Sequence, residues 1–116
     1  MGSAHHGHWA IEFRVGGAIQ GSETESSVAP TITVRADFDT SLAKITVNKD
    51  GDPFWFVQAV VASDTTITFT DPDPVVAGTS SYYYVRIEDA IGRLYWASPV
   101  WVDFTEPPIG TGVEAV

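Results

Sequence analysis

The feature that most constrains the fold of this chain is a short alternation of apolar and polar residues, repeated along most of its length. Ile45 and Val47, for example, alternate with Lys44, Thr46 and Asn48. A period of two places every second side chain on one face of a strand. Turn-forming glycine, proline and aspartate residues separate the alternating stretches. We therefore predict strands over residues 9–15, 31–38, 42–49, 54–61, 65–69, 82–88 and 93–102.

Seven short strands at this spacing predict an all-β fold, an immunoglobulin-like antiparallel β-sandwich. The chain has 116 residues, of which 44% are hydrophobic, and this suits a single domain with one core. We expect the sandwich to span residues 9–104. Residues 1–8 form a leader or linker, and residues 105–116 form a flexible C-terminal tail. Pro99 must lie at an edge or a bulge, because proline donates no ladder hydrogen bond.

The inventory of reactive side chains argues against catalysis by this chain alone. The sequence has no cysteine, which excludes a disulfide framework, a thiolate zinc site and a cysteine nucleophile. GxSxG and phosphate-binding glycine motifs are also absent. The only histidines are His5, His6 and His8, and we interpret their affinity for metals as adventitious or as an expression remnant. We predict no enzymatic activity and no cofactor.

The charge of the chain restricts its partners. Six basic and fifteen acidic residues give a net charge of −9. Such a surface repels phosphate backbones and anionic lipids, so we predict no nucleic-acid and no membrane partner. The chain has no apolar run of the ~20 residues that a spanning helix needs, and no secretory signal. The compartment stays open, and it includes export to the periplasm or the outside as part of a larger protein.

Acidic residues occur in pairs in the predicted loops after the first, third and fifth strands, which meet at one end of an immunoglobulin-like sandwich. Calcium takes six to eight oxygen ligands, so a converging set is a candidate calcium site. The alternative interpretation is that aspartate beside glycine or proline forms turns and keeps the protein soluble. We favour the second interpretation. The candidate ligands are Glu23, Glu25, Asp50, Asp52, Asp71 and Asp73.

Two predicted strands carry more apolar residues than a solvated antiparallel strand should. The strand over residues 54–61 is apolar on both faces, and tyrosines flank the inward Tyr83. We infer that something covers these positions: neighbouring side chains, a partner domain, a second copy of the chain or a stacked sugar. Tyr83 itself fits a tyrosine corner, with its hydroxyl bonded to upstream backbone. The candidate interface residues are Trp55, Val57, Tyr82 and Tyr84.

The stretch SYYYVRIEDAIGRLYWASPVWV, residues 81–102, resembles a known family. It is similar to the last hairpin of bacterial PHP-domain metallohydrolases, which are metal-dependent phosphoesterase-like enzymes. There a YYYVR strand, a short turn with a glycine and a WSSPIW strand close a C-terminal β-sandwich. This chain reads WASPVW at residues 96–101, and residues 45–51 and 16–22 also resemble parts of that sandwich.

In that family, histidines and acidic residues of an N-terminal, barrel-like α/β domain bind the catalytic metals. None of that domain is present in this chain, so no catalytic residue can be carried over. The resemblance implies a non-catalytic accessory domain that packs against and stabilises a catalytic domain absent from this chain. The alternatives are a stand-alone calcium- or carbohydrate-binding module of an exported protein, or a self-associating homodimeric domain.

Overall fold

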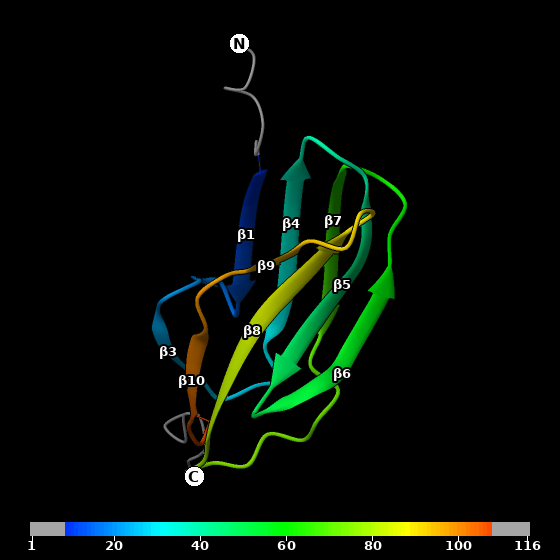
Figure 1. Ribbon diagram of the computed structural model, residues 1–116. Coiled ribbons are helices and arrows are strands. Elements are labelled where there is room, and N and C mark those ends of the chain that lie inside the picture. Colours follow the sequence, from blue (N-terminus) through cyan, green and yellow to red (C-terminus); the bar gives the residue numbers. More distant parts are fainter. Residues whose placement is uncertain (1–8, 108–116) are drawn as a thin grey trace, which may run out of the picture.

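A computed structural model describes residues 9–107 of the chain, which form two β-sheets packed face to face (Figure 1). The described residues contain no helix, so the predicted all-β sandwich is confirmed. It follows that none of these residues forms a helix that could span a bilayer. The strands are β1 (Trp9–Val15), β2 (Ala18–Ile19), β3 (Glu23–Ser26), β4 (Thr31–Phe38), β5 (Leu42–Lys49), β6 (Asp52–Ala59), β7 (Asp64–Thr70), β8 (Ser80–Asp89), β9 (Leu94–Trp96) and β10 (Val100–Phe104).

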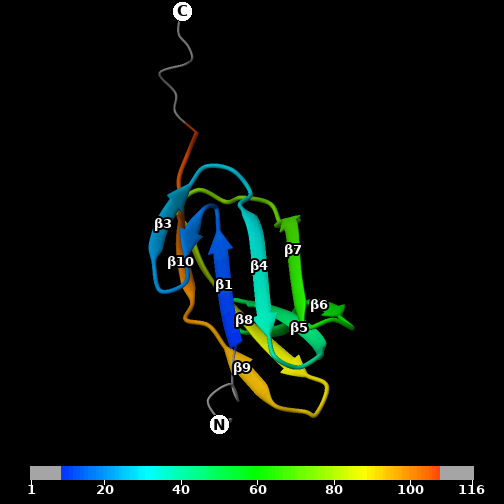
Figure 2. The same cartoon turned by 90° about the horizontal axis from the view of Figure 1, so that it is seen from above.

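The two sheets differ in size. The four-stranded sheet has the order β2-β1-β4-β7, and the six-stranded sheet has the order β3-β10-β8-β5-β6, with β9 also paired to β8. Figure 2 shows the two layers from above. The long strands β1, β4 and β7 lie in one sheet, and β5, β8 and β10 lie in the other. This is the immunoglobulin-like division of strands, with β6 added at the edge of the second sheet.

The core lies between the sheets and is built from the inward half of each alternating strand. Val34 of β4 and Val85 of β8 are fully buried, as are Phe13 of β1 and Ile45 of β5. Tyr83 is the largest of the fully buried side chains among the described residues. The alternation predicted around Ile45 and the inward position predicted for Tyr83 are therefore confirmed.

The predicted seventh strand is divided in two. Trp96 of β9 pairs with Arg86, whereas Val100 of β10 pairs with Tyr83, so the register along β8 shifts by one residue between them. Pro99 lies in this break, where it has no ladder hydrogen bond to donate. The prediction that Pro99 occupies an edge or a bulge is confirmed.

Two short strands, β2 and β3, were missed, and one pairing was wrong. β3 runs parallel to β10, so the sandwich is not purely antiparallel as predicted. β3 reads Glu-Thr-Glu-Ser and carries no hydrophobic residue, so the alternation that identifies a strand is missing there. It pairs through its backbone alone. The predicted leader, residues 1–8, and residues 108–116 of the predicted tail lie outside the described residues.

Candidate functional site

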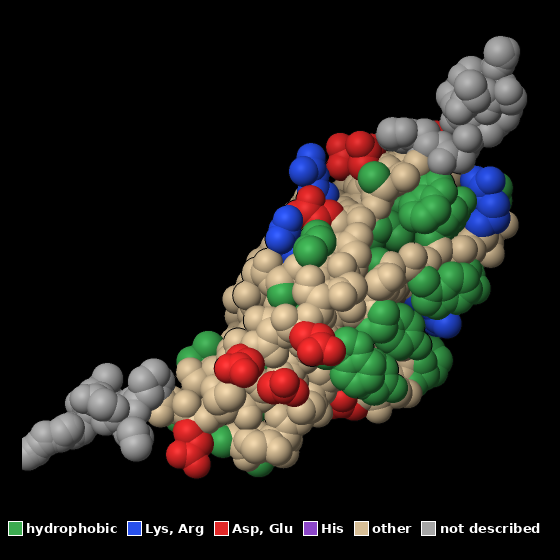
Figure 3. Space-filling model, turned by 90° about the vertical axis from the view of Figure 1, so that its left-hand side faces the viewer, with side chains coloured by type: hydrophobic (Ala, Val, Ile, Leu, Met, Phe, Trp, Pro, Cys, Tyr) green, Lys and Arg blue, Asp and Glu red, His purple; other side chains and the backbone are tan. Residues whose placement is uncertain are grey.

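The outer face of the six-stranded sheet carries exposed aromatic side chains on its β8, β9 and β10 portion. Strand pairing places alternate residues of these strands on the side away from the core. Trp96 is 53% exposed and Trp101 48% exposed, and the Trp101 ring lies 5.0 Å from that of Tyr82. Figure 3 shows hydrophobic side chains gathered in a band along one side of the molecule. We call Tyr82, Tyr84, Trp96 and Trp101 the aromatic face.

A buried amide lies beside the aromatic face. Asn48 of β5 pairs with Tyr84 of β8, so the two side chains share the outer face. Asn48 is only 1% exposed, and neither its amide nitrogen nor its amide oxygen has a hydrogen-bond partner in the described part of the chain. A buried amide without partners costs about 1–3 kcal/mol. The outer face therefore holds an unsatisfied donor and acceptor at the strand position opposite Tyr84.

The hairpin that presents Trp96 is held by a single buried carboxylate. The side chain of Asp89 accepts hydrogen bonds from the backbone N–H groups of Ile91 and Arg93, at 3.1 and 2.9 Å, and from the Arg93 guanidinium at 2.7 Å. Burial opposes ionisation of Asp89, but the bonds from Arg93 outweigh it and hold the pKa of the carboxyl below its usual value. Gly92, with φ of 92°, supplies the left-handed residue of this turn.

Charged side chains meet at the end of the sandwich where β5 and β7 finish. Lys49 Nζ donates to Asp71 Oδ2 and to Asp73 Oδ2, each at 2.8 Å. The Tyr83 hydroxyl donates to the same Asp71 oxygen at 2.6 Å, and Trp55 Nε1 donates to Asp73 at 3.0 Å. The Lys49 side chain is 11% exposed and that of Asp71 only 2%. We call these five residues the lysine cluster.

The lysine cluster shifts the titration of its members. Burial lowers the pKa of Lys49, but its hydrogen bonds to Asp71 and Asp73 outweigh this and raise the pKa above its usual value. The hydrogen bond from Lys49 lowers the pKa of Asp73. Burial, and then donation to Asp71, raise the pKa of the Tyr83 hydroxyl. Lys49 therefore stays charged and Tyr83 stays neutral through the physiological range.

The predicted tyrosine corner is wrong, because the Tyr83 hydroxyl bonds a side chain instead of backbone. A tyrosine corner would bond upstream backbone, whereas Tyr83 donates to the Asp71 carboxylate. Lys49 donates to the same carboxylate oxygen at the end of the core. The lysine was not among the predicted site residues.

The predicted acidic ligands do not form one set. The turn after β5 and the loop after β7 do lie at the same end of the sandwich, but Asp71 and Asp73 bind Lys49 there. Asp50 accepts hydrogen bonds from the Ser81 hydroxyl and the Tyr82 amide, and Asp52 accepts one from the Phe54 amide. Glu23 and Glu25 lie on β3 rather than in a loop, beside β10. Within residues 9–107 no three acidic or histidine side chains form a group that could hold a metal, and His5, His6 and His8 lie outside these residues.

The predicted interface residues divide between the two faces of the sheet. Tyr82 and Tyr84 lie outward and are partly buried, and Val57 is 46% exposed. Trp55 instead turns inward, with its ring 5.8 Å from Tyr83 and 5.7 Å from Phe69. Trp55 therefore does not share the face of the sheet on which Val57 lies. The cause is an irregularity in the β5–β6 register after Val47, which breaks the alternation.

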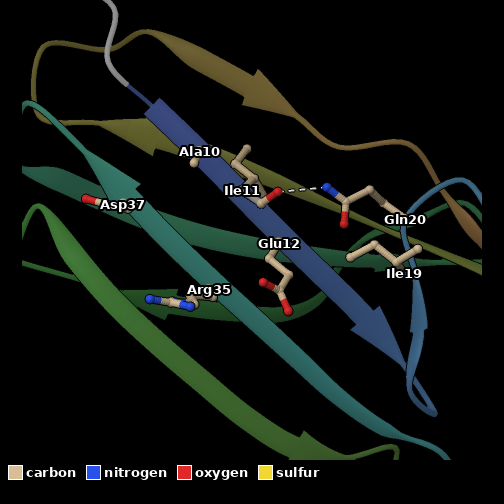
Figure 4. Close-up of a pocket in the computed structure, with 7 residues that line it drawn as sticks. All are labelled: Ala10, Ile11, Glu12, Ile19, Gln20, Arg35 and Asp37. Carbon is tan, nitrogen blue, oxygen red and sulfur yellow. Dashed lines mark hydrogen bonds between the residues drawn. The ribbon is translucent and has the colours of Figure 1, made fainter.

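A shallow pocket of about 450 Å³ lies against β1, β2 and β4 (Figure 4). Its lining combines charged Glu12, Arg35 and Asp37 with apolar Ile11 and Ile19. The Gln20 side chain crosses it, with Nε2 donating to the Ile11 carbonyl at 2.7 Å and Oε1 accepting from the Phe13 amide at 2.8 Å. Gln20 thus pairs with the β1 backbone as a strand would. We assign the pocket no chemistry, because its lining holds no serine, threonine, cysteine, lysine or histidine beside the two carboxylates.

Comparison with known proteins adds little to this geometry. No family model matches the chain. An uncharacterised protein of Chlamydia trachomatis serovar D is 23% identical over 109 residues, and the match covers 80% of this chain but 17% of that protein. The chain thus spans about a sixth of the relative it matches. The fibronectin(III)-like modules of Clostridium thermocellum CbhA superpose with a TM-score of 0.48 at 10% identity, covering 85% of this chain and 100% of the module.

Proposed function

We propose that this chain is a non-catalytic accessory module that docks another domain of a larger protein onto its aromatic face. The observation that carries the proposal is the pair of outward tryptophans, Trp96 and Trp101, each about half exposed. Tryptophan and tyrosine are the residues that most often dominate the energy of protein interfaces. A patch that combines them on one rigid sheet is suited to contact rather than to solvent.

The unsatisfied amide of Asn48 also supports docking at the aromatic face. It lies beside Tyr84 on the outer side of the sheet, where a docked partner can supply the missing donor and acceptor after a small side-chain shift. Acidic Glu23 pairs with Trp101, and Asp103 lies two residues further along β10. A partner surface with an apolar centre, and with basic residues opposite Glu23 and Asp103, would therefore complement the aromatic face.

The sequence resemblance suggests what the docked domain is. The hairpin that resembles PHP-type metallohydrolases, residues 81–102, contains all four residues of the aromatic face. A metal-dependent hydrolase domain of that type is therefore the partner that we propose. In this arrangement the sandwich supplies no catalytic residue and acts by stabilising the domain it contacts.

A neutral glycan is the second candidate for the aromatic face. Tyr82 and Trp101 lie 5.0 Å apart with an angle of 36° between their rings, and Trp101 is about half exposed. Such a pair can stack a sugar ring. Titration of the chain with neutral polysaccharides, read by tryptophan fluorescence, tests this candidate. Saturable quenching that is lost in Trp101→Ala but kept in Trp9→Ala would favour the glycan over the domain.

The proposed function is tested by the gene on both sides of the codons for residues 9–107. A reading frame that continues into a domain with a His-x-His pair and spaced acidic metal ligands supports the metallohydrolase. A frame that continues into a different catalytic domain supports the accessory role and removes the PHP assignment. A frame that closes on both sides without another domain contradicts docking within one polypeptide.

A further inference from the structure

The lysine cluster joins the two sheets at one end of the core. Lys49 is the last residue of β5 in the six-stranded sheet, and Asp71 directly follows β7 in the four-stranded sheet. The two residues are 22 positions apart along the chain, and Lys49 Nζ lies 2.8 Å from Asp71 Oδ2. The chain has no cysteine, so no disulfide can link the sheets. Lys49 and Asp71 instead bring an amine of one sheet into contact with a carboxyl group that follows the other.

The contact between Lys49 and Asp71 is nearly closed to water. Their side chains are 11% and 2% exposed, and the rings of Trp55 and Tyr83 lie 5.4 and 5.5 Å from Lys49 Nζ. Condensation of an amine with a carboxyl group is unfavourable for separate molecules in water. Two groups held in contact act instead at effective molarities that reach about 10⁵–10⁸ M, and a closed site keeps hydrolysis away. The surroundings of this pair therefore favour an amide bond between its members.

The two carboxyl oxygens of Asp71 have different partners. Oδ1 accepts a hydrogen bond from the backbone N–H of Asp73 at 2.7 Å, and Oδ2 accepts one from the Tyr83 hydroxyl at 2.6 Å. A fixed N–H donor stabilises the negative charge that develops on an oxygen when its carbon is attacked. An O–H donor assists an oxygen that leaves. Oδ1 is therefore placed to remain as an amide oxygen, and Oδ2 is placed to depart as water.

A second carboxylate is placed to move protons within the cluster. Asp73 Oδ2 lies 2.8 Å from Lys49 Nζ, and Trp55 Nε1 donates to the same oxygen at 3.0 Å and orients it. The Asp73 side chain is 46% exposed, whereas that of Asp71 is 2% exposed. Because water reaches Asp73 far more easily, an amide at Asp73 would be the more open to hydrolysis. Asp71 is therefore the better electrophile, and Asp73 is the group that carries protons.

We propose that Lys49 and Asp71 form an intramolecular isopeptide bond that joins the two sheets. Lys49 Nζ gives a proton to Asp73 and attacks Cγ of Asp71, so that a C–N bond forms and the bond from Cγ to Oδ2 breaks. Two of the three ammonium protons leave with Oδ2 as one water, and Asp73 returns to the carboxylate. The net charge of the cluster is unchanged, so the raised pKa of Lys49 slows the reaction without preventing it. The ion pair is the reactant, and freshly folded chain contains it.

Intact-mass spectrometry of the whole chain tests the bond directly. During incubation of the folded protein for days, a growing fraction should become lighter by the mass of one water. In that fraction trypsin should no longer cleave after Lys49. Acetylation of amines in the unfolded chain should label Lys44, the other lysine of the chain, but not Lys49. Lys44 is the internal control, because it forms an exposed pair with Glu88 at 3.8 Å.

Three variants separate this bond from other losses of water, such as ring closure of Asp50 onto the Gly51 amide. Lys49→Arg keeps a cation between the carboxylates and should keep the full mass, whereas ring closure at Asp50 would persist in it. Asp73→Ala should slow the loss of water at least about tenfold, because the proton carrier is gone.

Asp71→Asn should lose ammonia in place of water, because its amide nitrogen is then the leaving group. A wild-type chain that keeps its full mass throughout the incubation overturns the proposal. So does a loss of water that persists in Lys49→Arg, or one that leaves Lys49 open to trypsin and acetylation. None of these outcomes bears on docking at the aromatic face, which shares no residue with the lysine cluster.

Discussion

Replacement of Lys49 by methionine tests the role of the lysine cluster most sharply. Methionine keeps most of the apolar stem of Lys49 and removes the charge. The change leaves the Asp71 carboxylate, whose side chain is 2% exposed, without its cation. Two hydrogen bonds remain to it, from the Tyr83 hydroxyl and from the Asp73 amide.

The expected cost follows from this geometry. Breaking a buried ion pair by removing one partner costs about 3–5 kcal/mol. The two remaining hydrogen bonds and the 11% exposure of Lys49 place this case near the lower end, about 3 kcal/mol. Loss of the cation above the Trp55 ring, 5.4 Å from its centre, adds about 0.5–1 kcal/mol. Domains of this size have about 5–15 kcal/mol of stability, so the variant should still fold.

Urea unfolding followed by tryptophan fluorescence measures the effect. With a slope of about 1.5 kcal/mol per molar urea, the combined loss of about 3.5–4 kcal/mol lowers the midpoint by about 2.5 M. Lys44→Met is the matched control on the same strand, because Lys44 and Glu88 form an exposed pair at 3.8 Å that should contribute less than about 1 kcal/mol. The double variant Lys49→Met/Asp71→Asn should recover part of the loss. A loss below about 1 kcal/mol, or equal losses at both lysines, would refute the reasoning.

Three further predictions concern Asp89, Asn48 and calcium. Because the pKa of Asp89 is lowered, its ionised form stabilises the fold above about pH 4, and this contribution is lost as the pH falls through the folded pKa. In an acid titration followed by circular dichroism, Asp89→Asn should therefore flatten the fall in stability below pH 4. An unchanged slope would contradict the assignment. Asn48→Leu removes an unsatisfied amide and should raise the unfolding free energy by about 1 kcal/mol, or the melting temperature by about 5 °C. A loss of stability would show instead that the amide has partners in solution. Millimolar calcium should leave the unfolding midpoint unchanged, because Lys49 already bridges the carboxylates of Asp71 and Asp73. A rise that disappears with a chelator would restore the calcium hypothesis.

The long strands could be predicted from the sequence because each buries one face. The predicted ranges 9–15, 31–38 and 42–49 coincide with β1, β4 and β5. β3 could not be predicted, since Glu23–Ser26 has no apolar side chain and depends on the backbone of β10, a partner far along the chain. The inward turn of Trp55 depends on a register irregularity, and no local pattern encodes it.

The lysine cluster had a signal in the sequence that was not used. Lys49 continues the inward phase of Ile45 and Val47, so the alternation itself predicts a lysine at the end of the core. A buried lysine needs a carboxylate, and the loop after β7 supplies Asp71 and Asp73. The aromatic face was predicted in part, through Tyr82 and Tyr84. Trp96 and Trp101 were part of the recognised hairpin, but their exposure depends on the break at Pro99, which a continuous seventh strand would not contain.

Hydroxyl-radical footprinting of the three exposed tryptophans, in the full polypeptide encoded around residues 9–107, tests docking at the aromatic face most directly. Trp9, Trp96 and Trp101 are 45%, 53% and 48% exposed, so without a partner they should oxidise at similar rates. Trp9 lies on the other sheet and serves as the internal reference. Docking predicts that Trp96 and Trp101 are protected while Trp9 is oxidised as before. Oxidation of all three at similar rates would contradict it.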